Sequence, residues 1–513
     1  MFLPLAIADS VSSAPNDPPE VVELKRQLHW ALLKIQVLEE RLRLQRIQKY
    51  GPGSEKLSDA QLELLEWEPG VSNVEVQAES DRETLPRPPQ GERPRRHPGR
   101  QELPASLPRV ERVIACTPEQ CQCQSCGQAM TVIGYEVSEQ LDVEPAQYFV
   151  VVTKREKRAC RGCEQGGVAA ASVPARIVEK GLVSDRVVID TVISKYSDHL
   201  PLYRQSAILE RETGLEISRA TLDGWVMTVG GLLIPVAAAM GRELVGGSYI
   251  QADETPVDVQ MHDGRGRNHQ AYLWQYGRPG GSVVFDFRLG RGREGPKTFL
   301  GNFAGLLQTD GYSAYDKIGG PKLVQAACWS HCRRKFFEAH QLSPGESVAK
   351  GIVLLIDQLF GIDAEARAQA IDGAARDRLR QQHARPLLDT IKQQIEAARG
   401  QALPAGKLGG AISYTLTLWE KLTRFLDYPE LELSNNLAEN SMRPVALGRK
   451  NWIHIGSPQA GPKVAAILSI VETCRRLQIP ARKYLAAVLP GLANISIQRL
   501  PELTPTAWAA RNQ

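Results

Sequence analysis

The sequence has little net charge and no long apolar run. Its 62 Lys and Arg nearly cancel its 58 Asp and Glu, which leaves a formal charge of +4 over 513 residues. A surface for nucleic acid would therefore have to be a local patch and not a field over the whole molecule. No segment reaches the roughly 18 apolar residues that span a bilayer, and the short apolar stretch 2–8 lacks the basic flank of a signal peptide. We expect a cytoplasmic protein with reduced thiols and no membrane partner.

Nine cysteines in a chain of this length do not indicate a disulfide framework, and six of them crowd into residues 116–163. Two Cys-x-x-Cys pairs, separated by strand-like sequence that includes 147–154, are typical of a zinc ribbon, in which four thiolates hold one structural Zn²⁺. The expected ligands are Cys123, Cys126, Cys160 and Cys163. Cys121 is an alternative to Cys123, because the letters CQCQSC offer two registers. The ribbon is predicted to occupy residues 109–175.

The N-terminal part predicts a tail, a long helix and a linker. Residues 1–18 are expected to be disordered, and residues 19–50 to form a coiled-coil helix, because apolar residues recur at alternating spacings of four and three. This seam consists of Leu24, Leu28, Ala31, Ile35, Leu38 and Leu42. It favours a homodimer or a higher oligomer; the alternative is an amphipathic helix packed on its own protein. Residues 51–108 are predicted to be a Pro-rich linker with the basic run RPRRHPGR.

Residues 180–232 are predicted to be helical and to bind DNA. Helices are expected at 184–195, 202–212 and 219–229, with Ser184 and Ser218 as N-caps and Gly214 in the turn. The last two helices fit a helix-turn-helix whose second helix opens with polar residues, among them Arg219. The alternative is a plain helical hairpin within a core.

The following segment changes to strands. We predict strands at 248–252, 270–276, 282–287, 305–309 and 322–327, with a helix at 296–302. This order matches a ribonuclease-H-like α/β core, built from residues 245–330 and 429–456. An all-helical insertion at 331–428 would divide the two parts, and a helical region at 457–513 would follow. The fold class expected for the whole chain is multidomain α+β.

Three acidic motifs indicate the chemistry of this core. Asp253 is expected to end the first strand, Asp310 to follow the fourth, and Glu439 to lie on a later helix. Because the first and fourth strands are neighbours in this fold, the acids can share metal ions. Carboxylates so placed suit a pair of Mg²⁺ (or Mn²⁺) ions, which clamp the attacking and leaving oxygens in phosphoryl transfer. This predicts a nuclease that transfers DNA strands.

Each acid also has a structural alternative. Asp253 could cap the strand end at Thr255, Asp310 could form a turn before Gly311, and Glu439 could pair with Arg443 one turn later. Alternation along the strand sends Glu254 to the face opposite Asp253. A proline at position 444 is expected to kink or end the helix near Arg443.

Longer stretches of the chain carry a family resemblance. They are GPGSEKL (51–57), KYSDHLPLYRQ (195–205), SRATLDGWV (218–226), QADETPV (251–257), TDGYSAYD (309–316), CWSHCRRKFFEA (328–339), NNLAENSMRPVALGRKNW (435–452) and ETCRRLQIP (472–480). With the Cys-x-x-Cys pairs, these make the chain similar, nearly end to end, to bacterial transposases of the insertion-sequence sixty-six family. The segment 458–462 departs from the charged stretch that this family commonly has, which puts a DNA contact there in doubt.

The resemblance implies a DDE transposase that binds the ends of an insertion sequence, cleaves them and joins them to target DNA. It implies that Asp253, Asp310 and Glu439 are the catalytic triad, and that Cys328 and His331 form the family's Cys-x-x-His signature beside it. Arg443 and Lys450 would contact phosphate. The DNA-binding set is completed by Arg219, Arg333, Arg334, Lys335 and Arg449. Small accessory proteins from the same element are possible partners, and DNA-bound protein would associate with the nucleoid. The alternatives are a catalytically silent end-binding protein and a nuclease without joining activity.

Overall fold

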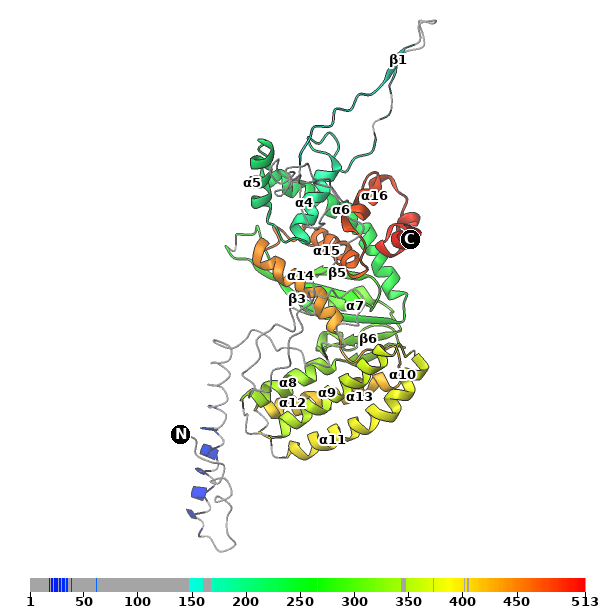
Figure 1. Ribbon diagram of the computed structural model, residues 1–513. Helices are drawn as coiled ribbons and strands as arrows, with labels where there is room; N and C mark the ends of the chain where they lie inside the picture. Colours follow the sequence, from blue (N-terminus) through cyan, green and yellow to red (C-terminus); the bar gives the residue numbers. More distant parts are fainter. Residues whose placement is uncertain are drawn as a thin grey trace, which may run out of the picture. The chain divides into compact units, whose positions relative to one another are not determined.

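The computed structural model describes residues 174–512 except 265, 343–346, 372, 401 and 404–405; it also describes 147–159, 168–170, 172, 61 and scattered positions from 18 to 38. The chain divides into two compact units, residues 1–85 with 172–513 and residues 86–171. Figure 1 shows the described elements in colour along the chain. The four predicted zinc ligands and Cys121 lie outside the described residues, as does the tail 1–17.

The described positions between 20 and 38 are helical. Position 18 is also described and precedes the helix. Four seam residues are exposed there, with between 49% and 63% of their surface accessible: Leu24, Leu28, Ile35 and Leu38. An apolar seam left open to water in one chain fits association with a second helix. In the predicted linker, Gln61 is helical and buried and donates to Ser330 Oγ at 2.9 Å, so the linker prediction is wrong at this residue.

A short antiparallel hairpin is described in the second unit. Its strands are β1 (Lys157–Ala159) and β2 (Val168–Ala170), and Ala159 lies opposite Val168. The connecting segment carries the second Cys-x-x-Cys pair, so the hairpin brings together the two ends of the segment that holds these thiols. The residues 147–154, predicted to be a strand, have no regular secondary structure.

Three helices precede the sheet: α4 (Asp185–Tyr196), α5 (Leu202–Thr213) and α6 (Arg219–Val245). The caps at Ser184 and Ser218 are in the predicted positions, although only Ser218 makes a side-chain cap bond, accepting from the Thr221 N–H at 3.2 Å. Helix α6 passes well beyond the predicted end at 229, because buried residues such as Leu233 and Met240 keep one face in the core despite Pro235.

Among the described residues, α6 is also the one helix whose length and composition would allow it to cross a membrane. Half of that apolar window is buried inside the protein. Its contacts with the sheet and with a later helix are those of a core helix.

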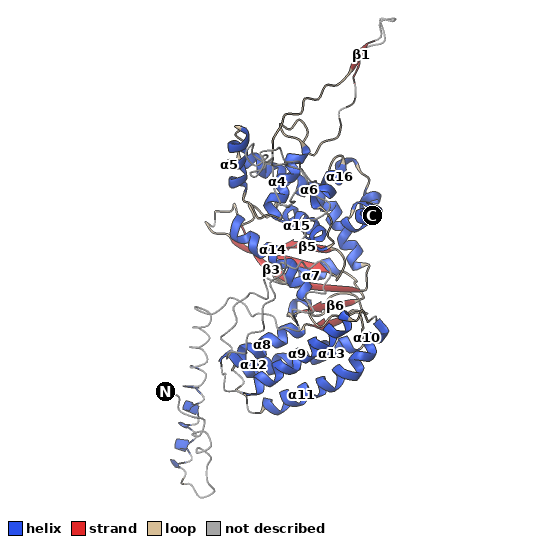
Figure 2. Ribbon diagram, in the orientation of Figure 1, coloured by secondary structure: helices blue, strands red, loops and turns tan. Residues whose placement is uncertain are grey.

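A five-stranded mixed sheet forms the centre of the larger unit (Figure 2). Its strands, in spatial order, are β5 (Val283–Arg288), β4 (His269–Gly277), β3 (Tyr249–Val259), β6 (Leu306–Thr309) and β7 (Val324–Ala327). The first three are antiparallel, whereas β6 is parallel to β3 and β7 is parallel to β6. Helix α7 (Glu294–Leu300) and a 3₁₀ turn (Ser313–Tyr315) connect these strands. All five predicted strands are confirmed.

Successive residues of β3 and β6 enter different hydrophobic cores. Tyr249 and Leu306 pack with the helices that follow β7, whereas Ile250 and Leu307 pack with the helices before β3 and after the insertion. Because neighbouring side chains of a strand point to opposite faces, the sheet is a middle layer with a helical layer on each side.

The insertion predicted at 331–428 is helical where it is described. It contains α8 (Trp329–Leu342), α9 (Ser347–Ala368), α10 (Gly373–Leu379), a π turn (Arg380–Ala384), α11 (Arg385–Arg399), α12 (Lys407–Thr417), α13 (Trp419–Thr423) and a 3₁₀ turn (Arg424–Leu426). The entry and exit of this segment are joined directly, since the Trp329 N–H donates to Leu433 O at 2.9 Å.

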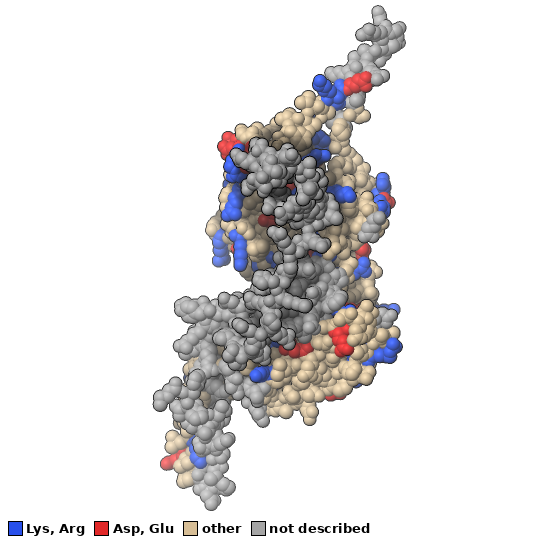
Figure 3. All heavy atoms as spheres, viewed as in Figure 1, with Lys and Arg blue, Asp and Glu red and all other residues tan. Residues whose placement is uncertain are grey.

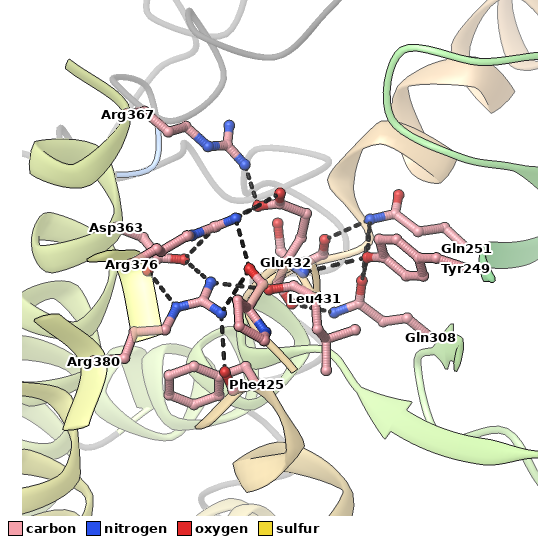
Figure 4. A network of polar contacts seen from close by, with 12 residues as sticks. Tyr249, Gln251, Gln308, Asp363, Arg367, Arg376, Arg380, Phe425, Leu431 and Glu432 are labelled. Carbon is pink, nitrogen blue, oxygen red and sulfur yellow. Dashed lines mark hydrogen bonds and ion pairs between the residues drawn. The ribbon is translucent and has the colours of Figure 1, made fainter. Parts of the chain in front are cut away.

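A buried polar network fastens the insertion to the sheet (Figure 4). Inside the insertion Asp363 pairs with Arg380 at 2.6 Å and with Arg376 at 2.9 Å. Arg376 also pairs at 3.0 Å with Glu432, and the Glu432 carbonyl accepts from the side chain of Gln308 on β6 at 2.7 Å. Insertion, exit segment and sheet are therefore connected through one set of contacts.

Helix α14 (Asn436–Trp452) follows the insertion and carries the third acid. Of the two predicted outcomes at Pro444, a kink or an end near Arg443, the end is wrong, because the helix runs through Pro444 to Trp452. Buried residues on both sides of the proline, Met442 and Val445, hold the helix against the core. That packing outweighs the loss of one backbone hydrogen bond.

The remaining elements are α15 (Gly461–Arg476), α16 (Ala481–Val488), α17 (Pro505–Asn512) and 3₁₀ turns at Leu492–Asn494 and Ile497–Leu503. Helix α15 covers the edge strand β5 with hydroxyl groups. The Val283 N–H donates to Thr473 Oγ1 at 2.9 Å, and the Phe285 N–H donates to Ser469 Oγ at 2.8 Å. These bonds satisfy edge groups that would otherwise be open to another strand.

Helices α6 and α15 approach closely at Gly230, and this contact gives a testable prediction. A Cβ at Gly230 would lie 2.7 Å from Lys463 Cβ and 2.9 Å from Lys463 O. We expect Gly230→Ala to lower the free energy of unfolding by about 1–3 kcal/mol, because the helices must separate. Gly224→Ala on the same helix is the matched control. Nothing lies within 4 Å there, so it should stabilise by about 0.5–1 kcal/mol. Urea unfolding followed by circular dichroism checks both; equal effects would contradict the close approach.

Candidate active site

Two of the predicted acids lie at the same level of neighbouring strands. The parallel pairing of β3 with β6 ends at the pair Gln251 and Gln308. Asp253 and Asp310 each stand two residues beyond this pair, Asp253 within β3 and Asp310 in the loop directly after β6. Asp253 is not at a strand end, as predicted, because β3 continues to Val259 against β4. The end of the parallel pairing, not the end of the strand, gives Asp253 its position.

The loop after β6 holds Asp310 through its own backbone. Asp310 Oδ1 accepts from the Tyr312 N–H at 2.8 Å. Gly311, with φ of +89°, makes the turn between them, and its N–H donates to Thr309 Oγ1 at 3.1 Å. The hydroxyl of Tyr414 on α12 donates to the carbonyl of Asp310. The insertion thus contacts the loop that carries the second acid.

Glu439 lies in the first turn of α14 and faces the first turn of α8. Its Oε1 is 3.6 Å from His331 Nδ1, and its Oε2 is 3.5 Å from Arg334 Nη2. Cys328 immediately precedes α8 and is buried. The donor atoms of Cys328, His331 and Glu439 all lie within 4.8 Å of one another. The predicted neighbours of the third acid are therefore brought to it.

Neighbouring charges shift the pKa values of Asp253 and His331. The pKa of Asp253 is raised well above its usual value by burial and by the like charges of Glu439 and Glu254, against a lowering by His331. Burial alone would lower the pKa of His331, but Cys328 and Glu439 outweigh it and raise this pKa to about 10. Crowded carboxylates with raised pKa values are typical of a functional site that a cation would stabilise.

Glu254, the nearest competitor of Asp253, has a different environment. Its Oε1 accepts from Arg291 at 2.7 Å and its Oε2 accepts from the Tyr315 hydroxyl at 3.0 Å. Burial raises its pKa, and Asp310 adds to this, while the Arg291 hydrogen bond opposes it. The two acids thus have different partners: Asp253 interacts with Glu439 and His331, and Glu254 is fixed by a cation and a hydroxyl group.

The predicted DNA-binding residues differ in how far their side chains are engaged inside the protein. Arg333 is buried and forms a pair with Asp357 at 2.6 Å, so its guanidinium is engaged inside the protein and it is a poor candidate for a phosphate contact. Arg449 is partly engaged, because it donates to the Pro256 carbonyl. Arg219 and Lys450 are exposed.

Three further candidates are neither buried nor fully exposed. Arg334 pairs with Glu439, the Nζ of Lys335 lies 4.5 Å from the centre of the Tyr414 ring, and Arg443 is half-buried. In the face drawn in Figure 3, basic and acidic side chains are interspersed among the described atoms. This agrees with the small net charge.

The hydrogen bonds that hold the strand segments before Asp253 and Asp310 were not predicted from the sequence. The side chain of Gln251 donates to Gln308 Oε1 at 3.0 Å, and the Tyr249 hydroxyl donates to the same oxygen at 2.5 Å (Figure 4). Gln251 also donates to Ser434 O at 3.1 Å, in the segment that leads into α14. A signal was present, because both motifs place a glutamine two residues before the aspartate, on the same strand face.

Three family models match the chain. The model described as "Transposase IS66 family" matches residues 180–463, "zinc-finger binding domain of transposase IS66" matches 120–164, and "Transposase C of IS166 homeodomain" matches 37–112. The first spans the sheet, the insertion and α14, and therefore all three acids.

Curated relatives come from Sinorhizobium fredii. The uncharacterized protein y4qI is 33% identical over 497 residues, covering 92% of this chain and 89% of its own length. The uncharacterized protein y4hP is 29% identical over 500 residues, with 93% and 88% covered. A third, y4jD, is 32% identical and covers 80% of this chain and 82% of its own. The similarity thus extends over nearly the whole chain.

Proposed function

The chain belongs to the IS66 family of transposases, and from this premise we propose that it cuts the ends of an insertion sequence and joins them to target DNA. Its zinc-finger and transposase regions suggest a DNA-acting enzyme. We further propose a ribonuclease-H-like core, supported by the strand order β5-β4-β3-β6-β7. The observation that supports the proposed activity is that the charge of Glu439 on α14 acts on Asp253 of β3, while Asp310 follows the neighbouring strand β6.

The donor set fits divalent cations. Carboxylate oxygens are the ligands that Mg²⁺ and Mn²⁺ prefer, and a cation would relieve the repulsion that raises the pKa of Asp253. When bound, two such ions supply an activated water or DNA 3′-hydroxyl and neutralise charge on the scissile phosphate. Asp253, Asp310 and Glu439 would hold these ions through their carboxylate oxygens. Arg334 would hold the Glu439 carboxylate in place.

Regions outside the core would locate the DNA. We propose that α5 and α6 act as a helix-turn-helix with exposed Arg219 at the start of the second helix, and that Arg443 and Lys450 on α14 contact phosphate near the acids. The zinc ribbon, with Zn²⁺ on its four thiolates, would assist end recognition. The exposed seam of the N-terminal helix would pair two copies, each on one end. Such a protein would act in the bacterial cytoplasm, on the nucleoid, with or without accessory proteins.

A cleavage and joining assay tests the proposed function. A labelled duplex with the terminal repeats that flank the gene is incubated with Mg²⁺ and either the wild type or Glu439→Gln. We expect cut and joined products from the wild type, and neither from the variant, because an amide is a poor ligand for these ions. Nicked product without joining would indicate a nuclease. Specific binding without cleavage by the wild type would indicate an end-binding protein.

A further inference from the structure

Three donor groups of different chemistry converge where α8 and α14 begin. They are the thiol of Cys328, the imidazole of His331 and the carboxylate of Glu439, with one donor atom from each lying within 4.8 Å of the others. Cys328 and His331 stand before the insertion and Glu439 stands after it. From sequence the Cys-x-x-His pair lacks the further ligands that a metal site needs; the fold supplies the third.

Two of these atoms have no hydrogen-bond partner although they are buried. They are His331 Nδ1 and Glu439 Oε1, and they face each other at 3.6 Å. That separation is too long for a hydrogen bond. It suits two ligands of one tetrahedral ion, because bonds of about 2.0–2.3 Å place neighbouring ligand atoms roughly 3.3–3.6 Å apart. Buried polar atoms left without partners otherwise cost free energy.

The surroundings of the sulfur also suit a metal-bound thiolate. The Asn435 N–H donates to Cys328 Sγ at 3.5 Å, from the residue that caps α14. A backbone donor of this kind stabilises negative charge on a ligating sulfur and orients it. The other oxygen of Glu439, Oε2, is directed at Arg334, so Oε1 is the atom that faces His331 and the shared position.

We propose that Cys328, His331 and Glu439 bind a thiophilic divalent ion, with Zn²⁺ as the best match, beside the catalytic carboxylates. Thiolate and imidazole ligands select Zn²⁺ or Co²⁺ and are avoided by Mg²⁺, so this position is chemically distinct from the Mg²⁺ positions. Three protein ligands leave a fourth position open for water or a DNA oxygen.

The ion would connect the first turn of α8 to the first turn of α14, and so fix the carboxylate of Glu439 relative to Asp253. It therefore acts as a positioning device for the third acid. This role rests on the proposed function, because Glu439 belongs to both sites. The binding of the ion does not, since it can be measured without DNA.

The test compares zinc content in the full chain and in a full-length variant with Cys160→Ser and Cys163→Ser, which removes the ribbon site. We expect the ribbon variant to retain one zinc ion per chain after dialysis against Mg²⁺, and to lose it on adding Cys328→Ser or His331→Asn. Cys332→Ala is the matched control, because Cys332 is a buried thiol on the same helix whose partner is Thr415; it should keep the ion. Elemental analysis provides the count, and circular dichroism checks folding.

Cobalt provides a second readout that does not depend on how the Cys328→Ser and His331→Asn variants fold. The ribbon variant loaded with Co²⁺ should show a near-ultraviolet thiolate-to-cobalt band from a single sulfur. A ribbon variant that holds no zinc and gives no such band would overturn the inference, and His331 would then pair with Glu439 as a protonated ring. If zinc is bound but the wild type neither cuts nor joins DNA, the metal site stands and the proposed function fails.

Discussion

Asp253→Asn should abolish Mg²⁺-dependent strand cleavage while leaving the protein folded. The side chains are nearly the same size, so the packing of β3 is kept, but the amide carries no charge and holds a divalent ion poorly. Asp253 is half-buried, and Glu439 is close enough for its charge to raise the pKa of Asp253. We expect a loss of about a thousandfold or more in the cleavage rate, about 4 kcal/mol in the barrier. Single-turnover cleavage of a labelled terminal duplex measures it.

Glu254→Gln is the control for that experiment. Glu254 is the next residue on the same strand, but it is held by Arg291 and Tyr315. Its loss should disturb this support and reduce the rate far less, within about tenfold, or 1.4 kcal/mol. If Glu254→Gln were inactive and Asp253→Asn active, the first catalytic position would have been assigned to the wrong one of two adjacent acids. Binding to the same duplex should survive in both variants, because neither residue is a predicted phosphate contact.

Asp363→Asn should destabilise the insertion by about 3–5 kcal/mol. Asp363 is buried and receives two arginines, one of which, Arg380, is itself fully buried. Arg380 also donates to the carbonyls of Phe425 and Leu431, each at 2.9 Å (Figure 4). Removing the carboxylate leaves a buried guanidinium without its counter-charge. Urea unfolding should show a lower midpoint, and Asp389→Asn, at an exposed position of α11, should show little change.

The same pair gives a direction for the effect of pH. Burial opposes the charge of Asp363, but Arg380 and Arg376 outweigh it and lower its pKa to about 2. A pKa that is lower in the folded than in the unfolded state adds stability above the unfolded value, about 3.9. That stability is lost as the pH falls through about 4 towards 2. The wild type should therefore lose more stability than Asp363→Asn over this window; parallel acid-unfolding curves would contradict the assignment.

Local patterns were sufficient to predict the sheet. Each predicted strand is a short apolar run bounded by turn residues, and this local pattern is enough to predict that the segment forms a strand. The extent of β3 could not be predicted in this way, because the sequence 254–259 (ETPVDV) is not a continuous apolar run and becomes strand only through pairing with β4. The extent of α6 likewise depends on a buried face that is visible only once α15 is placed. Pro444 stays helical because packing on both sides outweighs a local preference.

The elements that carry the three acids could be predicted, but the environment of the acids could not. Asp253 and Asp310 follow from strand order, and Glu439 from its motif and the family resemblance. The basic run at 333–335 looks uniform in sequence, yet Arg333 points into the helical core to reach Asp357, while Arg334 meets Glu439. Helix phase decides which neighbour is buried, and that phase is set by contacts across the insertion. The Gln251 and Gln308 pair is the opposite case. The repeated position of a glutamine two residues before an aspartate is visible in the sequence, but only the fold shows that the two side chains bond to each other.

The direct bond between Trp329 and Leu433 has a consequence for how the enzyme is made. Residues 330–432 must be synthesised and folded before the exit segment can meet the entry segment, and only then does α14 reach the sheet. At about 5–20 residues per second, the ribosome delivers Glu439 roughly 10–40 seconds after Asp253. During that interval the nascent chain already holds the N-terminal regions that we propose bind DNA, but it has no third carboxylate. A chain still on the ribosome could therefore hold a DNA end without being able to cut it.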